Sequence, residues 1–448
     1  MTNAKLSVIV VGAGLGGLAA AIALATRGHT VTLLEAAPKL GEIGAGIQIP
    51  PNSTAVLKLL GVFDKLKEVV VEPSSINMVN YKTGEILGPA ALNPYVEQAY
   101  GSPYWLIHRA DYHKQLHARA QEVGVNIIVD SKVVSVDESV PSVTTCDGFY
   151  DTPAKTYTAD IVIAADGIQS GLRKLIFPDL TGEVLESESS AYRCTLTAEQ
   201  MSGDPALEKL MQNPSATSWI GPGGHIMAYP IRNGQLYNMV LLHPAGDEKS
   251  GEWNTPATTE EMLAKYDGWD PLVRKMIAMV PSAMKWKVCY LKELDSWRSR
   301  SGKIVLLGDS AHATVPFLAQ GAAMAMEDAI TLAECLDLAK DPTEYTDLLS
   351  IYEEIRKPRT TRIVKGSLEM GRINHLPDGP EQQARDEALK NAASKGTAAP
   401  TRYEALSSTE IPPYDLKNPN PWSDTVFEPW MLGYDVVKVV RTRLGLKA

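Results

Sequence analysis

Hydrophobic residues gather in short continuous runs in the first part of this chain, and such runs are typical of buried parallel strands. Residues 6–12 (LSVIVVG), 29–35 (HTVTLLE) and 159–167 (ADIVIAADG) are three of them. Between the first two lies an alanine- and leucine-rich stretch, residues 18–28, which predicts a helix that ends at Gly28. A strand, a helix and a second strand in this order predict a β-α-β unit at the start of the chain.

The pattern changes to alternating positions in the middle of the chain. Residues 190–197 (SAYRCTLT) alternate, and residues 225–242 (HIMAYPIRNGQLYNMVLL) contain two runs joined by Asn233-Gly234, a strong hairpin signal. A buried run then returns at residues 303–308 (KIVLLG). The sequence therefore predicts one parallel core that is interrupted by a second core with an antiparallel sheet.

We expect an α/β protein with a Rossmann-like domain, an inserted antiparallel-sheet domain and a C-terminal helical segment. The Rossmann-like domain is assigned to residues 1–75, 101–180 and 291–375, the inserted domain to 76–100 and 181–290, and the C-terminal part to 376–448. Residues 376–424 are rich in Pro, Ala, Ser and Asn and are expected to form a loosely ordered wrap. Residues 427–440 predict a closing helix that docks on the protein.

The composition of the chain limits which classes of partner and which cellular locations are expected. The chain has 448 residues and a net charge of −10, without a stripe of Lys and Arg, which argues against nucleic acid. Its four cysteines are far apart, as in proteins of a reducing cytosol, so a cytoplasmic location is expected. No stretch approaches about 18 apolar residues, so we expect no membrane span. Monomer and homodimer both stay open.

Three glycines follow the first strand with the spacing G-x-G-x-x-G. Gly12 allows a tight turn, Gly14 lets a pyrophosphate approach the backbone, and Gly17 lets helix and strand pack closely. Glu35 ends the second strand, where an acid binds ribose hydroxyls. Together these residues predict dinucleotide binding, but they do not distinguish FAD from NAD.

Residues 308–329 (GDSAHATVPFLAQGAAMAMEDA) hold unusually many small side chains before an ordinary helix. Small residues at a helix start let a bulky group approach the backbone, and the helix N-terminus favours negative charge. This stretch predicts contact with a flat, partly anionic ligand.

Together with residues 12–17 (GAGLGG) and 165–167 (ADG), this stretch resembles the single-component flavin monooxygenases of the salicylate hydroxylase type, in particular the fungal ones. It matches that family's pattern GD-x-AH-x-x-x-P-x-x-x-QG-x-x-x-A-x-EDA, and the resemblance spans about residues 6–370. It implies an FAD-binding domain of the p-hydroxybenzoate hydroxylase type and a sheet that binds substrate. The family often has Gly where Ala319 stands, and alanine is small enough that we expect no loss of function.

The resemblance implies non-covalently bound FAD, with NADH or NADPH visiting as a transient co-substrate. Asp309 is implied to hydrogen-bond the ribityl chain, and the helix that starts near Gly321 to direct its N–H groups at the flavin. The resemblance further assigns Glu35 to ribose, Gln48 and Arg109 to the cofactor, and Ala322 to a backbone contact with the ring. Without the resemblance, Arg109 would be interpreted as part of a surface salt bridge.

The implied activity is hydroxylation of a small phenol- or indole-type aromatic molecule with O₂ and NAD(P)H through a C4a-hydroperoxyflavin. Decarboxylation, dearomatisation, epoxidation or a role in secondary metabolism stay open. One alternative is a non-catalytic flavin-fold protein that binds another protein, against which the complete flavin-loop motif argues. Another is a flavin-dependent halogenase, but the chain has no WxWxIP motif.

Three residues are candidates for the substrate face. Residues i, i+2 and i+4 of a strand share one side, so His225, Met227 and Tyr229 point together, and Arg193 lies in another strand of the same predicted sheet. The resemblance places Arg193 near a phenol oxygen and Tyr229 in a matching hairpin. A guanidinium stabilises a phenolate, Tyr229 can hold or relay the proton, and His225 can serve as the base. A core tyrosine and an edge-strand arginine are the alternative interpretation.

Two further pairs of residues have both a functional and an ordinary structural interpretation. Asp166 and Arg173 follow the family's DG motif, but they also suit a strand-end turn and a helix start. His113 and His117 have the four-residue spacing of metal ligands, without an HExxH glutamate or an evident third ligand. We therefore expect no metal site and interpret both as surface histidines.

Overall fold

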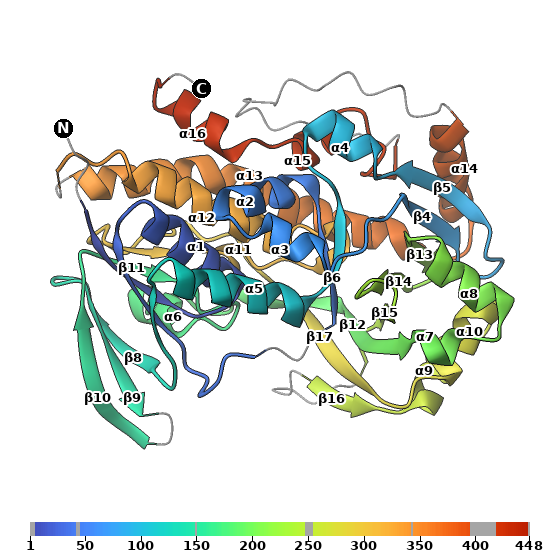
Figure 1. Cartoon of the computed structure of the whole chain (residues 1–448). Coiled ribbons are helices and arrows are strands. Elements are labelled where there is room, and N and C mark those ends of the chain that lie inside the picture. The colour runs from blue at the N-terminus through green and yellow to red at the C-terminus, as the bar shows by residue number, and fades with distance from the viewer. Residues whose placement is uncertain are drawn as a thin grey trace.

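A five-stranded parallel sheet forms the core of one half of the protein, as seen in the computed structural model (Figure 1). The structure describes residues 5–41, 45–147, 150–246, 254–341, 344–394 and 418–446. The strand order is β18-β11-β1-β2-β7, with β1 at Ser7–Val11, β2 at Thr30–Leu34, β7 at Asn126–Ile128, β11 at Ile161–Ala164 and β18 at Ile304–Leu306. The four predicted strands that belong to this sheet are confirmed, and most of their residues are buried because helices cover the sheet.

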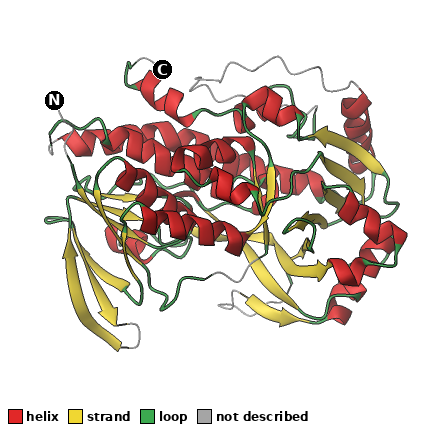
Figure 2. Cartoon of the chain, in the orientation of Figure 1, coloured by secondary structure: helices red, strands yellow, loops and turns green. Residues whose placement is uncertain are grey.

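Helices cover the parallel sheet, and Figure 2 shows how they gather above it. The predicted first helix is α1, Leu15–Thr26, and it packs against α5, Arg109–Glu122, and α12, Gly321–Leu336. Further helices of this half are α2 at Pro51–Leu60, α3 at Phe63–Lys67, α6 at Gly171–Ile176 and α13 at Tyr345–Asn374. The long α13 lies along α12, so it supports the segment that the sequence singles out.

Two smaller sheets complete this half. A short antiparallel pair joins β3, Gly46–Ile49, to β6, Trp105–His108. A three-stranded antiparallel sheet consists of β8, Lys132–Asp137, β9, Ser142–Asp147, and β10, Tyr150–Thr158. The three-stranded sheet was not among the predicted elements.

The second half is an eight-stranded sheet, antiparallel except where β4 runs parallel to β13. Its order is β16-β17-β12-β15-β14-β13-β4-β5, with β4 at Ser75–Asn80, β5 at Ile86–Ala91, β12 at Val184–Thr197, β13 at Ser215–Gly221, β14 at Gly224–Ile231, β15 at Leu236–Pro244, β16 at Asn254–Ala257 and β17 at Ala283–Leu291. Short helices accompany it: α7 at Ala198–Met201, α8 at Pro205–Gln212, α9 at Thr259–Lys265 and α10 at Pro271–Ala278. The predicted hairpin is β14–β15, whose turn holds Arg232 and Asn233 at positive φ.

The C-terminal part is more regular than the sequence predicts. A helix, α14 at Pro380–Ser394, occupies the first portion of the expected loose wrap, where its buried Leu389 packs against β5. The prediction was wrong there because composition does not show this contact, and residues 395–417 lie outside the described ranges. The expected closing helix is divided in two, α15 at Phe427–Leu432 and α16 at Val436–Arg443.

A buried carboxyl on α15 gives this segment a pH dependence. Glu428 is 5% exposed, and its Oε1 accepts a hydrogen bond from Tyr100 Oη at 3.0 Å, on α4, Tyr95–Tyr100. Burial raises the pKa of Glu428 to about 8, outweighing the opposing effect of Tyr100. Because the folded pKa exceeds the unfolded one, Glu428 costs no stability at acidic pH and destabilises the fold as pH rises toward 8.

We therefore expect Glu428→Gln to stabilise the protein more at pH 9 than at pH 5, by about 2–4 kcal/mol in the free energy of unfolding. Denaturant unfolding at the two pH values measures this difference. Glu97→Gln, on the exposed side of α4, is the matched control and should show no such pH dependence. An equal effect of Glu428→Gln at both pH values would show that the carboxyl is not held neutral.

Candidate active site

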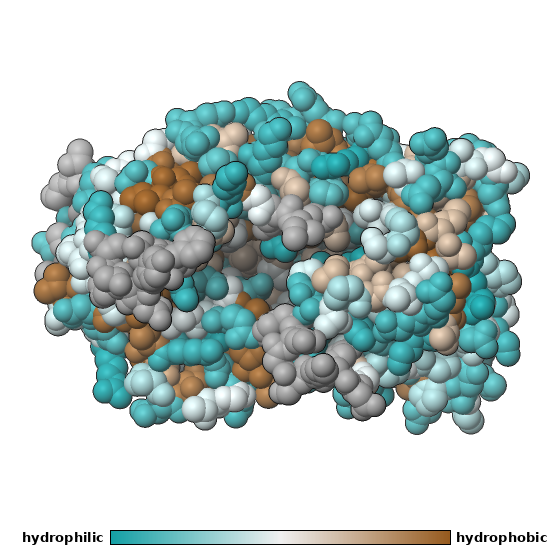
Figure 3. All heavy atoms as spheres, turned by 90° about the horizontal axis from the view of Figure 1, so that it is seen from below, coloured by the Kyte–Doolittle hydropathy of each residue, from teal (hydrophilic) through white to brown (hydrophobic). Residues whose placement is uncertain are grey.

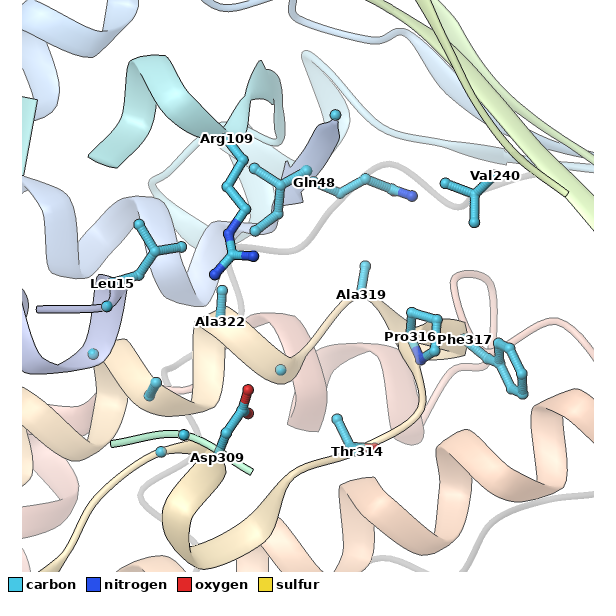
Figure 4. Close-up of a pocket in the computed structure, with 18 of the residues that line it drawn as sticks. Leu15, Gln48, Arg109, Val240, Asp309, Thr314, Pro316, Phe317, Ala319 and Ala322 are labelled. Atoms are coloured by element: carbon cyan, nitrogen blue, oxygen red, sulfur yellow. The ribbon is translucent and has the colours of Figure 1, made fainter. Parts of the chain in front are cut away.

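A cavity of about 340 Å³ lies where the parallel sheet, the eight-stranded sheet and α12 meet (Figure 4). Most of its lining comes from the glycine loop, from β3, β14 and β15, and from the segment between β18 and α12. The predicted site residues on its wall are Gly14, Gly17, Gln48, Arg109, Arg193, His225, Tyr229, Asp309, Gly321 and Ala322. The space-filling view in Figure 3 shows a largely hydrophilic face that is hollowed near its centre.

A different steric reason explains why each of the three positions of the first motif is glycine. Gly12 has a φ of +104°, and a Cβ there would lie 2.4 Å from the Ala165 carbonyl oxygen. A Cβ at Gly17 would lie 2.0 Å from the carbonyl oxygen of Gly12. No atom lies within 4 Å of a Cβ built on Gly14, so a ligand phosphate has room beside it. The backbone at the start of α1 is thus open to an anion.

Two side chains hold this loop from behind. Glu35 accepts the Ala13 N–H at 2.7 Å and the Ala37 N–H at 2.8 Å, and it does not line the cavity. Its contact with a ribose stays a prediction. His113 is 5% exposed, and its Nε2 lies 2.7 Å from the Ala13 carbonyl oxygen. The interpretation of His113 as a surface histidine was wrong, because α5 packs beneath the loop. No metal-binding group of three side chains occurs among the described residues.

The segment before α12 shapes the opposite wall. Gly308, at φ +66°, ends the strand, and the exposed Asp309 carboxylate points into the cavity toward Ala322 (Figure 4). Ala319 adopts a left-handed φ of +54°, a conformation that explains why glycine is common there. α12 then begins at Gly321 without a side-chain cap, so its first N–H groups stay open to a ligand.

Arg109 and Gln48 reach the cavity from the far side. Arg109 begins α5 directly after β6, and its guanidinium points down toward Ala322 in Figure 4. Arg109 therefore lines the cavity wall, and its contact with the cofactor stays a prediction. Gln48 on β3 extends along the cavity, and its Oε1 accepts the Tyr104 hydroxyl at 2.7 Å.

The eight-stranded sheet brings the three candidate catalytic side chains to the same cavity. Burial lowers the pKa of Arg193, partly offset by Tyr229. Burial raises the pKa of Tyr229 above its ordinary value, although Arg193 acts in the opposite direction. Burial also holds the pKa of His225 well below its ordinary value. At neutral pH Tyr229 is therefore a neutral phenol and His225 a neutral imidazole, and the guanidinium groups of Arg193 and Arg109 both line the same cavity.

A buried ionic cluster beneath the cavity was missed by sequence reasoning. The Glu327 carboxylate accepts bonds from Arg359 Nε and Nη2, both at 2.8 Å. The Asp328 carboxylate accepts Arg356 Nε at 2.7 Å, lies 2.6 Å from His312 Nε2 and accepts the Gly308 N–H at 3.0 Å. The signal was two adjacent acids between apolar residues in the first half of α12, where they need buried partners.

The cluster fixes the geometry of the cavity wall. Asp328 ties α12 to the turn that carries Asp309 by its bonds to Gly308 and His312. Arg359 also donates to the carbonyl oxygens of Trp430 and Met431, at 2.9 and 3.0 Å, and so holds α15 in place. The final acids of the long motif are therefore scaffold residues in this structure.

Asp166 and Arg173 make structural contacts at the strand-end turn and at the start of the following helix. The Asp166 carboxylate accepts Ser170 Oγ and the Leu172 N–H, and so it stabilises the start of α6. Arg173 is fully buried, forms an ion pair with Glu183 at 3.2 Å and donates to the Ser310 carbonyl oxygen at 2.9 Å. Arg173 thus supports the turn next to Asp309 from below.

These residues fit FAD. The open backbone beside Gly14 accepts a pyrophosphate, Asp309 can accept bonds from hydroxyl groups, and the small side chains at the start of α12 leave room for a flat ring. Among the described helices, none combines the length and the apolar character needed to cross a bilayer.

The chain is similar to known FAD-dependent proteins in both sequence and fold. Residues 5–367 match the family described as FAD binding domain. The FAD-dependent monooxygenase OpS4 of Beauveria bassiana (strain ARSEF 2860) is 36% identical over 438 residues, covering 97% of this chain and 96% of that protein. The 3-hydroxybenzoate 6-hydroxylase of Polaromonas naphthalenivorans (strain CJ2) is 34% identical over 408 residues, covering 90% and 95%.

Solved structures share the fold. A complex of CtdE with FAD and a substrate has a TM-score of 0.79 at 23% identity, and a salicylate hydroxylase substrate complex has a TM-score of 0.76 at 22% identity. Each covers 98% of this chain and is itself covered to 98%. The chain therefore belongs to the FAD binding domain family and is an FAD-dependent monooxygenase.

Proposed function

We propose that this enzyme hydroxylates a small phenol-type aromatic molecule with O₂ and electrons from NADH or NADPH. Bound FAD supplies the electron transfer and the activation of oxygen. The observation that carries the proposal is the single cavity wall on which Arg193, Tyr229 and His225 face the Asp309 and Gly321 segment. The names of two groups of relatives, 3-hydroxybenzoate 6-hydroxylase and 3-amino-4-hydroxybenzoate 2-monooxygenase, support a hydroxylated ring as substrate.

The three side chains suit the activation of a phenol. A phenolate is attacked by electrophilic oxygen faster than a phenol, yet an unperturbed phenol ionises only near pH 10. Arg193 is proposed to stabilise the phenolate oxygen with charge-assisted hydrogen bonds. Tyr229 donates a hydrogen bond to that oxygen, because its raised pKa keeps it neutral. His225 accepts the phenol proton, because its lowered pKa keeps it unprotonated at neutral pH.

The rest of the wall suits a flat apolar ring. Met227 and Val240 lie on neighbouring strands, and Phe317 closes the end of the cavity opposite Leu15 (Figure 4). Apolar walls exclude water from the reacting atoms, which limits the loss of oxidising equivalents as peroxide. We also propose a cytoplasmic location, which is supported by four buried free cysteines.

The test is a screen of hydroxybenzoates, aminohydroxybenzoates and indoles with the FAD-loaded protein. We expect acid precipitation to release a yellow flavin into the supernatant, and we expect at least one phenol to give hydroxylated product in step with NADH or NADPH oxidation and O₂ uptake. Peroxide is measured in parallel, because uncoupled oxidation gives peroxide instead of product. Indoles as the preferred substrates, or cofactor oxidation without product for every compound, would contradict the proposal.

A further inference from the structure

A second histidine stands directly behind His225. His225 Nδ1 lies 2.7 Å from Nε2 of His375, the residue that follows α13. A distance this short between two ring nitrogens requires one proton between them, so one ring donates and the other accepts. His225 is 3% exposed and lines the cavity, whereas His375 does not line it and is only partly buried. The pair therefore joins the cavity to the protein surface.

The surroundings hold both rings in this arrangement. The Phe317 ring stands edge-on to His225 at 5.1 Å and to His375 at 5.6 Å between centroids. Phe317 can lie there because residue 371 is glycine, where a Cβ would come within 2.5 Å of the ring. The Gly223 N–H donates to the His375 carbonyl oxygen at 3.0 Å, which fixes the end of α13 against the turn before β14.

The charges around the pair favour neutral rings. Burial and, to a smaller extent, the Arg385 guanidinium on α14 together lower the pKa of His375 to about 4. Arg385 is held by Asp386 at 2.8 Å and donates to the Ile373 carbonyl oxygen at 2.9 Å. Burial, followed by His375 itself, lowers the pKa of His225. A proton that reaches His375 is therefore not retained there, since a positive charge beside it favours release to water.

We propose that His225 and His375 form a two-step proton relay through which the substrate phenol loses its proton to solvent. This inference rests on the proposed function. The phenol O–H bond breaks as its proton moves to His225 Nε2, the Nδ1 proton of His225 moves to His375 Nε2, and the Nδ1 proton of His375 passes to water. Both rings end neutral, and each has changed from its Nδ1–H tautomer to its Nε2–H tautomer. One proton leaves for each phenolate formed. His375 is then a positioning residue that acts through His225.

Oxidised, FAD-loaded enzyme mixed with 4-nitrophenol in a stopped-flow instrument tests the relay without turnover. Absorbance reports the phenolate, and a pH indicator in weak buffer reports the released proton. We expect His375→Gln to form the same final amount of phenolate at least about tenfold more slowly. Glutamine can still hydrogen-bond His225, but it does not pass on a proton, so a merely structural role of His375 would survive this change.

Two controls separate the outcomes. His117→Gln, on α5 and outside the cavity wall, should leave both signals at wild-type rates. His375→Asn repeats the test if His375→Gln binds less FAD. Wild-type rates in His375→Gln would overturn the relay and leave the proposed function standing. A wild-type enzyme that forms no phenolate would overturn the phenolate chemistry of the proposed function, and the relay with it.

Discussion

Replacing Asp328 by alanine is expected to lower the free energy of unfolding by about 3–5 kcal/mol, because it leaves a buried arginine without one of its partners. Arg356 is fully buried and loses its 2.7 Å bond to Asp328. Burial alone would raise the pKa of Asp328, but His312 and Arg356 reverse this and hold it below its ordinary value. The carboxylate is therefore charged at neutral pH, and its removal breaks a true ionic contact.

The same change should also weaken FAD binding, because the Gly308 N–H and His312 lose the acceptor that fixes their turn. Denaturant unfolding of the cofactor-free protein and a flavin titration measure the two effects separately. Asp309→Ala is the matched variant in the same turn. Its side chain is exposed, so we expect unchanged stability without FAD but a roughly tenfold or larger loss of flavin affinity, about 1–3 kcal/mol.

These two variants distinguish scaffold from ligand contact. If Asp328→Ala unfolded at the wild-type denaturant concentration, the buried cluster would not support the fold. If Asp309→Ala lost stability in the cofactor-free protein and bound FAD normally, Asp309 would only cap the turn.

Changing Arg193 to methionine should lower the rate of product formation by roughly thirtyfold or more, about 2 kcal/mol in the barrier. Methionine has a similar length and no charge, so the substrate oxygen loses its cation in a site from which water is largely excluded. Arg193→Lys keeps a point charge but not the planar fork, and an intermediate loss of about tenfold is expected. NAD(P)H oxidation should continue in both variants, with peroxide replacing product.

The pH profile is the sharper measurement for Arg193. A phenol ionises without help near pH 10, so product formation by Arg193→Met should recover as pH rises toward that value. Val240→Ala is a suitable control, because it enlarges the same cavity without changing its charge. Wild-type coupling in Arg193→Met across the pH range would show that Arg193 does not bind the phenolate.

The parallel core and most of the cavity wall could be predicted because their signals are local. Continuous apolar runs mark β1, β2, β11 and β18, and the motif at 308–329 marks Asp309 and Gly321. The strand period alone placed His225 and Tyr229 on one face, and both line the cavity. In each case the residues that matter are neighbours in the sequence, so their pattern carries the information.

Contacts between distant segments were not predictable in the same way. Glu327 and Asp328 pair with arginines on α13 that lie about 30 residues later in the sequence. His225 contacts a histidine 150 residues later. His113 looks like a surface residue until α5 is placed under the glycine loop. Each depends on how two elements pack, and a single sequence holds no periodic signal for that.

The order of strands in the parallel sheet also governs when a growing chain can first bind its cofactor. β11 lies between β1 and β18, but β18 is synthesised only after the whole eight-stranded sheet. At about 5–20 residues per second, the edge of β11 stays unpaired on the order of ten seconds on the ribosome. Asp309 and α12 emerge later still, so FAD cannot bind early enough to protect the nascent chain. Other parts of the chain, or chaperones, must therefore keep the unpaired edge of β11 from pairing with a wrong strand.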